Sequence, residues 1–146
     1  MDRGGVAVGL TVLAGGMIAL QAPINGMLGK TVGSFTAATI SFVIGTIALI
    51  GITVVTGVGD VGEAKTLPWY YLIGGVLGAI YVTTALVAVQ TLGAGGVTAA
   101  TITGQLTASV VVDRYGLLGL DERPLTWQRV LGVALLAAGV FLVVRD

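Results

Sequence analysis

The sequence predicts an all-α integral membrane protein, and its composition and charge spacing carry that prediction. Apolar residues make up 55% of the 146 positions and charged residues only 10%, against about 25% charged in an ordinary soluble domain. The charges leave long uncharged runs at 4–29, 31–59, 66–112 and 130–144. A helix needs about 20 apolar residues to cross roughly 30 Å of hydrocarbon, so a chain of this size cannot hide these runs in a soluble core.

Five transmembrane helices are expected, and the first two uncharged runs supply one each. The run over 66–112 is too long for one span, and it breaks most easily at the weak helix formers Gly93–Gly96. The last run is short, but Trp127 can lie among the lipid headgroups and Arg129 can extend toward water. The expected spans are 5–28, 34–56, 68–91, 95–113 and 125–144.

Helix-end signals support these bounds. Ser34 and Thr126 are expected to be N-cap residues, and Pro68 suits the first turn of the third span. Pro23 removes a backbone hydrogen bond and is expected to kink or interrupt the first span.

Composition also restricts the chemistry. The chain has no His and no Cys, which removes imidazole bases, thiolate nucleophiles and most zinc ligands. Seven basic residues balanced by seven acidic ones supply little charge for binding nucleic acid. We therefore expect no enzyme activity, no cofactor, no metal site and no nucleic-acid partner.

An odd number of spans places the two termini on opposite sides of the membrane. Basic residues then favour a cytoplasmic N-terminus, but only modestly, so insertion in both orientations is possible. We see no internal repeat, which predicts one repeat unit of an inverted-repeat transporter and an antiparallel homodimer. A parallel oligomer, or pairing with a different inverted subunit, remains an alternative. The basic residues fall in two groups, Arg3, Lys65, Arg114, Arg123 and Arg129 on one side and Lys30 and Arg145 on the other.

Small residues spaced four apart predict close helix packing within the membrane. The expected packing positions are Gly45, Gly74, Gly78 and Gly104.

The fourth span carries a polar stripe. Thr98, Thr101, Gln105, Ser109 and Asp113 recur at steps of three or four and fall within about 120° of a helix circumference. Threonine and serine hydroxyls can bond back to their own helix, whereas the Gln105 amide needs a neighbouring helix or water. The stripe therefore lines either a polar cavity or a helix–helix contact.

Two further spans contribute polar side chains. Gln21 and Asn25 flank the expected interruption at Pro23, where a transporter site or a simple polar helix end could lie. Tyr81 and Thr84 share a face of the third span, and Tyr81 either lines a cavity or bonds to Gln105 or Ser41. The predicted substrate pathway comprises Gln21, Asn25, Ser41, Tyr81, Thr84, Thr101, Gln105 and Ser109.

No charged residue lies at mid-depth in any expected span, so a site that grips cations with a buried carboxylate is disfavoured. Asp113 ends the fourth span beside Arg114, and local pairing or capping is expected for it. The expected cargo is a neutral, zwitterionic or weakly polar small molecule.

Several strings together resemble the half-length, five-helix YdcZ-type branch of the drug/metabolite transporter superfamily. They are Gln21-x-x-x-Asn25, Ala38-Thr-Ile-Ser41-Phe42-x-x-Gly45-Thr46, Pro68-Trp69 leading to Gly74-Gly75-x-x-Gly78-Ala79-x-Tyr81, Gly104-Gln105-x-x-x-Ser109-x-x-x-Asp113-x-x-Gly116 and Arg129-x-x-Gly132. The resemblance implies a bacterial inner-membrane protein whose fold is one half of a ten-helix inverted-repeat transporter. Many relatives have His where this chain has Arg114 or Tyr115.

The sequence thus predicts a multi-pass transporter that forms one membrane domain over 1–146 and works by alternating access. Its expected partners are the lipid bilayer, a second copy and a small-molecule substrate. A non-transporting assembly or scaffold subunit, or one half of a heterodimeric transporter, is the alternative.

Overall fold

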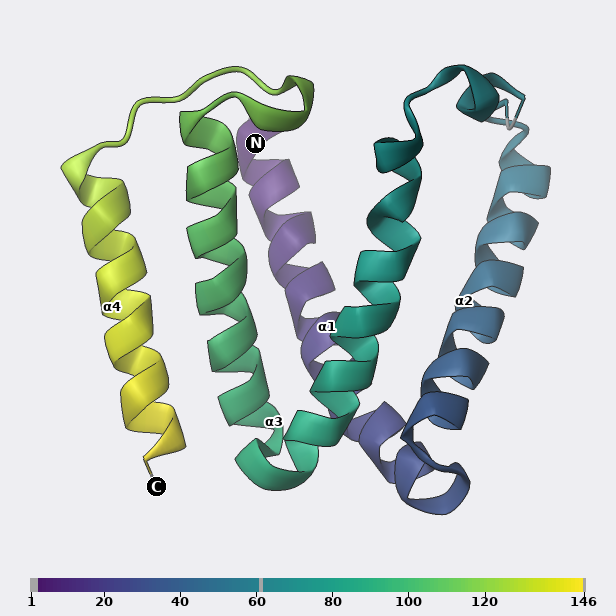
Figure 1. Ribbon diagram of the computed structural model, residues 1–146, viewed down its shortest axis with the longest axis horizontal. Coiled ribbons are helices and arrows are strands. Elements are labelled where there is room, and N and C mark those ends of the chain that lie inside the picture. The colour runs from purple at the N-terminus through teal and green to yellow at the C-terminus, as the bar shows by residue number, and fades with distance from the viewer. Residues whose placement is uncertain (1–2, 61, 146) are drawn as a thin grey trace. The chain divides into compact units, whose positions relative to one another are not determined.

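A computed structural model describes residues 3–60 and 62–145, and over these residues the chain consists of helices and their connections (Figure 1). The side chain of Arg3, which enters the charge count above, lies outside the described part. The chain divides into two compact units, Met1–Thr91 and Leu92–Asp146. Each unit is described by itself.

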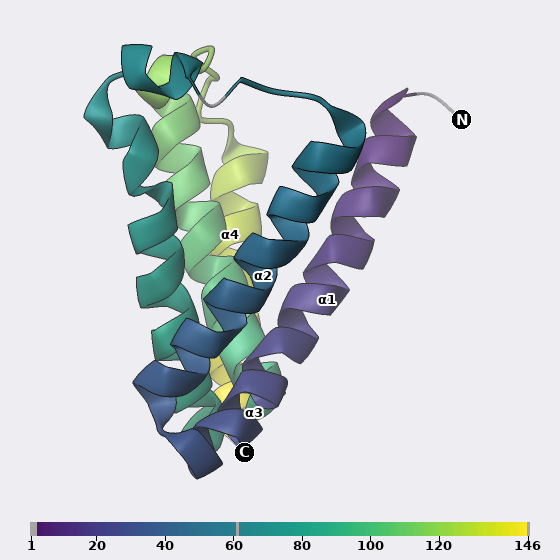
Figure 2. The same ribbon diagram turned by 90° about the vertical axis from the view of Figure 1, so that its right-hand side faces the viewer.

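The first unit begins with a helical hairpin. Helix α1 spans Arg3–Val32 and α2 spans Ser34–Thr56, and the two pack against each other above their connection, which lies at the bottom of the view in Figure 2. Gly33 makes that connection with φ 86°, a conformation that side chains with a Cβ seldom adopt. Its N–H donates to the Gly29 carbonyl, and its own carbonyl accepts from Ala37 N–H, both at 2.9 Å. The hairpin is therefore closed by one glycine.

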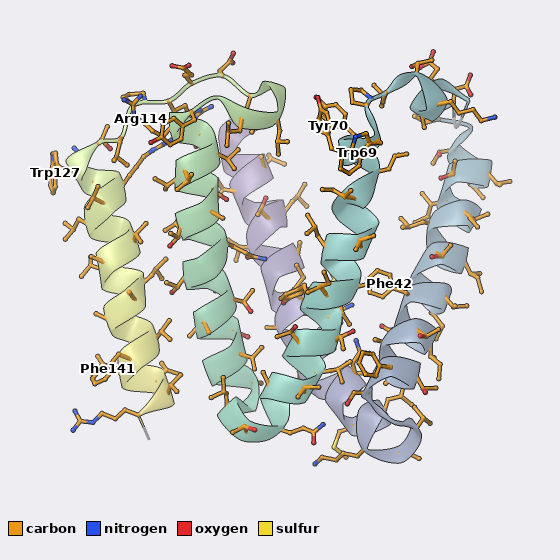
Figure 3. All side chains as sticks on the ribbon, in the orientation of Figure 1. Phe42, Trp69, Tyr70, Arg114, Trp127 and Phe141 are labelled. Carbon is orange, nitrogen blue, oxygen red and sulfur yellow. The ribbon has the colours of Figure 1, made fainter. Side chains whose placement is uncertain are left out.

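Two short 3-10 helices precede the third long helix. After the left-handed Gly57 that ends α2, η1 spans Glu63–Thr66 and η2 spans Trp69–Ile73. Pro68 precedes η2 as its N-cap, so it lies just outside the helix and not in its first turn. Trp69 and Tyr70 meet edge to face, with ring centroids 6.3 Å apart (Figure 3).

Helix α3 spans Gly74–Arg114 and contains one residue with non-helical geometry, Gly93, at φ 68° and ψ 171°. This is the first residue of the Gly93–Gly96 stretch in which the sequence predicts a break, and that prediction is confirmed. Residues 74–91 belong to the first unit and residues 92–114 to the second.

The second unit is a pair of helices joined by an ordered loop. The loop contains η3, Leu117–Gly119, and leads to α4, Trp127–Val144. Backbone N–H of Arg123 donates to the Asp113 carbonyl at 2.8 Å, which ties the loop to the end of α3. Gly116 has φ 56°, and a Cβ there would lie 2.8 Å from Glu122 Cγ, so the loop folds tightly on itself.

Four helices in the described residues are long and apolar enough to cross a membrane. The predicted bounds 34–56 agree with α2 at both ends. Helix α1 begins two residues before and ends four residues after the predicted span 5–28, and it continues through Pro23. A transmembrane helix tolerates the loss of one hydrogen bond when its neighbours support the remaining backbone.

The predicted N-caps fare differently. Gly33, and not Ser34, caps α2, because the left-handed turn of the hairpin requires glycine there. Thr126 is the N-cap of α4, as predicted, but its side chain makes no capping hydrogen bond.

The core of the first unit lies where α1, α2 and α3 converge. Leu86 of α3 is fully buried and clusters with Val82 and Ala38, with Tyr81 packed against them. Glycines of α1 permit the approach, since a Cβ on Gly29 would lie 3.4 Å from Leu86 Cδ1 and one on Gly26 only 2.6 Å from Val89 Cγ1. The first unit thus has its tightest packing beside the polar residues at the end of α1.

Candidate functional site

A crevice between α1 and α3 in the first unit brings together three of the residues predicted for the substrate pathway. Gln21 and Asn25 project from α1 and Tyr81 from α3, and the other lining residues are Ala22, Val82 and Ala85. Gln21 and Asn25 meet there because a four-residue step returns to the same helix face. The crevice therefore places two amides and a phenol in a small apolar setting.

Asn25 is the polar centre of this crevice. Its side chain is 5% exposed, and within the described residues its Nδ2 is buried without a hydrogen-bond acceptor. The crevice is too narrow to admit a water molecule. An orphaned buried donor costs about 1–3 kcal/mol, and the described part of the single chain supplies no acceptor that would offset this cost.

Pro23 lies on α1 between these two amides. Because proline has no N–H, the carbonyl of Ala19 loses its usual partner within the helix. Gly26, one residue after Asn25, presses its backbone toward the Leu86 carbonyl, which would lie 3.5 Å from an added Cβ. The end of α1 thus combines free polar groups with close packing on α3.

Two other predicted pathway residues do not line this crevice. Ser41 is half-buried on α2 and Thr84 is exposed on α3. In the described part of the chain the Tyr81 hydroxyl has no hydrogen bond to Ser41 or to any other residue. The pathway predicted across three spans is therefore assembled only in part within the first unit.

A separate apolar groove of about 540 Å³ lies between α2 and α3. Phe42 of α2 faces α3 across it (Figure 3), and its ring would lie 3.4 Å from a Cβ on Gly78. The other lining residues are Phe35, Ala38, Thr39, Val43, Thr46, Ile47, Ala79 and Thr83. Its few hydroxyls give it little capacity to recognise a polar solute.

In the second unit, the predicted polar stripe has free side chains. Thr101 is half-buried, and Gln105 and Ser109 are exposed. None of these three makes a side-chain hydrogen bond within the described ranges, 3–60 and 62–145. These three side chains of the stripe are therefore available to water, a ligand or another chain.

Threonines off the stripe behave differently. Thr103 and Thr107 donate to the carbonyls four residues earlier, at 3.1 and 2.7 Å. One alternative for the stripe was that its hydroxyls bond back to carbonyls of their own helix. In this part of α3, such bonds are made by Thr103 and Thr107, next to the stripe, and not by the stripe hydroxyls of Thr101 and Ser109.

The predicted packing glycines show an uneven pattern. Gly78 meets Phe42, but an added Cβ would find nothing within 4 Å at Gly45, Gly74 or Gly104. Three of the four expected packing positions therefore have no partner within the described part of a single chain.

Asp113 pairs with a residue that sequence reasoning did not choose. Its Oδ2 lies 3.3 Å from Nη1 of Arg129 on α4, whereas local pairing or capping at the end of the fourth span was expected. Adjacent helical residues point in directions about 100° apart, and the loop returns the chain so that Arg129 reaches Asp113. The sequence did contain a signal for this pair, because Asp113 ends one expected span and Arg129 lies near the start of the next.

In the part of the chain that the structure describes, no cluster of acidic residues could hold a metal ion. The arrangement offers hydrogen-bonding side chains on apolar helices, without a set of acids, bases or nucleophiles in contact. Such groups can bind and orient a polar molecule.

Comparison with known families gives a match along nearly the whole chain. A family model described as "Putative inner membrane exporter, YdcZ" matches residues 6–142. Neither the curated proteins nor the solved structures include a match. Together with four helices capable of crossing a membrane, this identifies the chain as a member of the YdcZ family of inner-membrane proteins.

Proposed function

We propose that the protein exports a small polar molecule as an antiparallel homodimer, in which each copy supplies one half of an inverted-repeat transporter. Alternating access would occur around a pathway that includes the predicted residues Gln21, Asn25, Tyr81, Thr101, Gln105 and Ser109. The single observation that carries this proposal is the buried Asn25 amide, whose Nδ2 has no hydrogen-bond acceptor within the described residues. It marks a polar site whose hydrogen bonds one chain does not complete.

Five membrane spans belong to the same proposal. Helix α3 has 41 residues and would extend about 60 Å as a straight helix, roughly twice the hydrocarbon thickness. The non-helical Gly93 divides it into segments 74–92 and 94–114, each long enough to cross once. With α1, α2 and α4 these segments give an odd number of spans, which an inverted pair of copies requires.

Unpartnered packing positions support a second copy. Gly45 of α2 and Gly104 of α3 face open space in the single chain. Small residues in membrane helices allow backbones to approach closely, so these positions suit helices contributed by a partner. The alternative of a scaffold subunit uses the same surfaces but leaves the polar groups dry.

The cargo follows from the donor set. Amides and hydroxyls line the proposed pathway, and the charged residues of the described chain lie at or beyond helix ends. Neutral amides and hydroxyls both donate and accept hydrogen bonds, so the cargo is an uncharged or zwitterionic molecule with its own donors and acceptors.

Thiol accessibility tests the proposal directly. The chain has no cysteine, so single substitutions Asn25→Cys and Gln105→Cys give an unambiguous label in reconstituted vesicles. We expect both to react with a small membrane-impermeant thiol reagent, position 25 only when alternating access opens the crevice around it. The control Leu13→Cys, on the exposed apolar part of α1, should stay unreactive. Unreactive cysteines at both 25 and 105, with no solute flux in a broad screen, would instead support a dry scaffold.

A further inference from the structure

A second, chemically different surface lies within the second unit. A groove of about 320 Å³ runs between α4 and the part of α3 that follows Gly93. Its only hydroxyl-bearing lining residue is Thr107, whose hydroxyl donates to the Thr103 carbonyl at 2.7 Å, so the wall of the groove is effectively apolar. The remaining lining residues are Val110, Val111, Leu125, Val130, Val133, Ala134 and Ala137.

One end of this groove adjoins an incompletely satisfied cation. Arg129 directly precedes Val130 of the groove wall, and its Nη1 lies 3.3 Å from Asp113 Oδ2. This contact is an ion pair without hydrogen-bond alignment, since Nη1 is buried and has no hydrogen-bond acceptor in the described chain. A guanidinium carries five N–H donors, so one carboxylate at this distance leaves most of its binding capacity free.

The surroundings of Arg129 favour a negatively charged group. The first turn of α4 contains no acidic residue, and Thr126 makes no capping hydrogen bond, so free backbone N–H groups remain there. Exposed Trp127 projects from the same end of α4, and Arg114 lies at the facing end of α3 (Figure 3). A cation, a tryptophan and an apolar groove together match the three zones of a bilayer lipid.

We propose that this groove is a phospholipid site. The lipid phosphate accepts hydrogen bonds from the Arg129 guanidinium, and one acyl chain lies along the groove between Val110 and Ala137. A bare anion would leave the groove without an occupant, and a bare hydrocarbon would leave the accessible part of the Arg129 guanidinium, whose side chain is 29% exposed, without an acceptor. A phospholipid meets both requirements, because a planar guanidinium binds phosphate well.

Lipid retention by the purified full-length protein tests the site. In detergent, dioleoyl phosphatidylglycerol and dioleoylglycerol carry the same chains but differ in the anionic phosphoglycerol headgroup, and native mass spectrometry counts each bound lipid. We expect the wild-type chain to retain phosphatidylglycerol about tenfold better than dioleoylglycerol, the factor set by loss of a charged hydrogen bond. Arg129→Gln should abolish that preference.

Two charge variants separate lipid binding from a structural role of the ion pair. Asp113→Asn frees Arg129 and should leave phosphatidylglycerol retention equal to or above wild type. Arg145→Gln makes the same charge change at the far end of α4, where Arg145 lies 5.7 Å from the Phe141 ring centre, and should have no effect. Equal losses in Asp113→Asn and Arg129→Gln would overturn the proposal, because Arg129 would then act only through the pair.

A groove-filling variant gives an independent result if Arg129→Gln fails to fold. Ala134→Phe keeps every charge and fills the groove, so it should reduce phosphatidylglycerol retention at least tenfold. Unchanged retention in this variant, or full displacement of the lipid by millimolar inorganic phosphate, would show that the groove holds no acyl chain and would overturn the proposal. A second protein copy in the groove would appear as dimer with no retained lipid, and would also overturn it.

Discussion

Asn25 places an unpaired amide in the most closely packed part of the first unit. A group kept for stability would be expected to have its partner, and this one has none within the described chain. Its position beside Gln21 and Tyr81 is therefore better explained by binding than by folding. A role in binding and a role in folding predict opposite changes in the free energy of unfolding when Asn25 is replaced.

Replacing Asn25 with leucine should stabilise the protein and impair its function. Leucine has a similar size and removes the orphaned donor, so we expect the free energy of unfolding to rise by about 1 kcal/mol. Unfolding in mixed micelles measures stability, and flux in vesicles measures function. Gln21→Leu is the matched control, because Gln21 is exposed and its replacement should change stability little. A large loss of stability in Asn25→Leu would show that Asn25 is structural.

Gly26 determines how closely α1 approaches α3. A Cβ at this position would lie 2.6 Å from Val89 Cγ1, so Gly26→Ala forces a shift of the two helices and should destabilise the protein by about 1–3 kcal/mol. Gly15→Ala, on the same helix with nothing within 4 Å, should be neutral or slightly stabilising, since alanine favours helix. Unfolding of the two variants side by side checks this, and equal effects would contradict the packing described here.

Sequence reasoning recovered some residue-level features and missed others for identifiable reasons. The sequence grouped Gln21 with Asn25 because residues four apart share a helix face. It added Tyr81 because a tyrosine hydroxyl in the middle of a span needs a hydrogen-bond partner. The Asp113–Arg129 pair was missed because the position of Asp113 at a span end favoured local pairing or capping, whereas the tight loop around Gly116 decides which residues meet. Loop geometry of this kind depends on backbone angles that residue spacing does not encode.

At the scale of elements, α3 shows how a long apolar run is subdivided. Gly93 has φ 68° and ψ 171°, in a region of backbone angles that is essentially restricted to glycine. Composition alone was enough to locate this break, since glycines cluster there. Composition could not show that α1 would continue through Pro23, because that outcome depends on how neighbouring helices support the backbone.

Gly93→Ala should therefore destabilise the protein by about 1–3 kcal/mol, the usual cost of forcing a Cβ into this region. Gly95→Ala is the control two residues later, where an added Cβ makes an ordinary 3.8 Å contact with Val143. Thermal denaturation in detergent compares the two. If both variants behave alike, Gly93 does not occupy the conformation described.

The accuracy of the predicted helix bounds depends on how abruptly the sequence changes at each helix end. Charges and glycines bracket α2 sharply, and the predicted 34–56 agrees with Ser34–Thr56. The third span begins gradually, through η2, because Trp69–Ile73 has no strong capping signal before it. The predicted start at Pro68 was therefore several residues early for the α-helix.

At the scale of the whole molecule, the proposal depends on orientation in the membrane. Basic residues favour one orientation only modestly, so we expect a reagent-accessible tag after Asp146 to be labelled from both sides of the inner membrane in one population of cells. Adding two lysines to the 57–67 loop should shift the tag to one side, because cytoplasmic loops are enriched in basic residues. Labelling from a single side in the unmodified protein would contradict dual insertion.

The sequence alone could establish membrane residence and family, because both depend on composition and on motifs spread over the chain. It could not establish assembly. Open space at Gly45 and Gly104 shows surfaces ready for close packing, but small residues suit a neighbour of either orientation. Which orientation applies depends on the balance of charges across the bilayer and on encounters between inserted chains.

The boundary between the two compact units falls beside Gly93, the residue at which α3 leaves helical geometry. Each side of that point has its own internal contacts, the Leu86 cluster before it and the Asp113–Arg129 pair after it. A polypeptide cut there would lose one covalent link and none of those contacts. Two separately translated fragments should then each keep their own internal packing, which makes this glycine a natural point for dividing the gene.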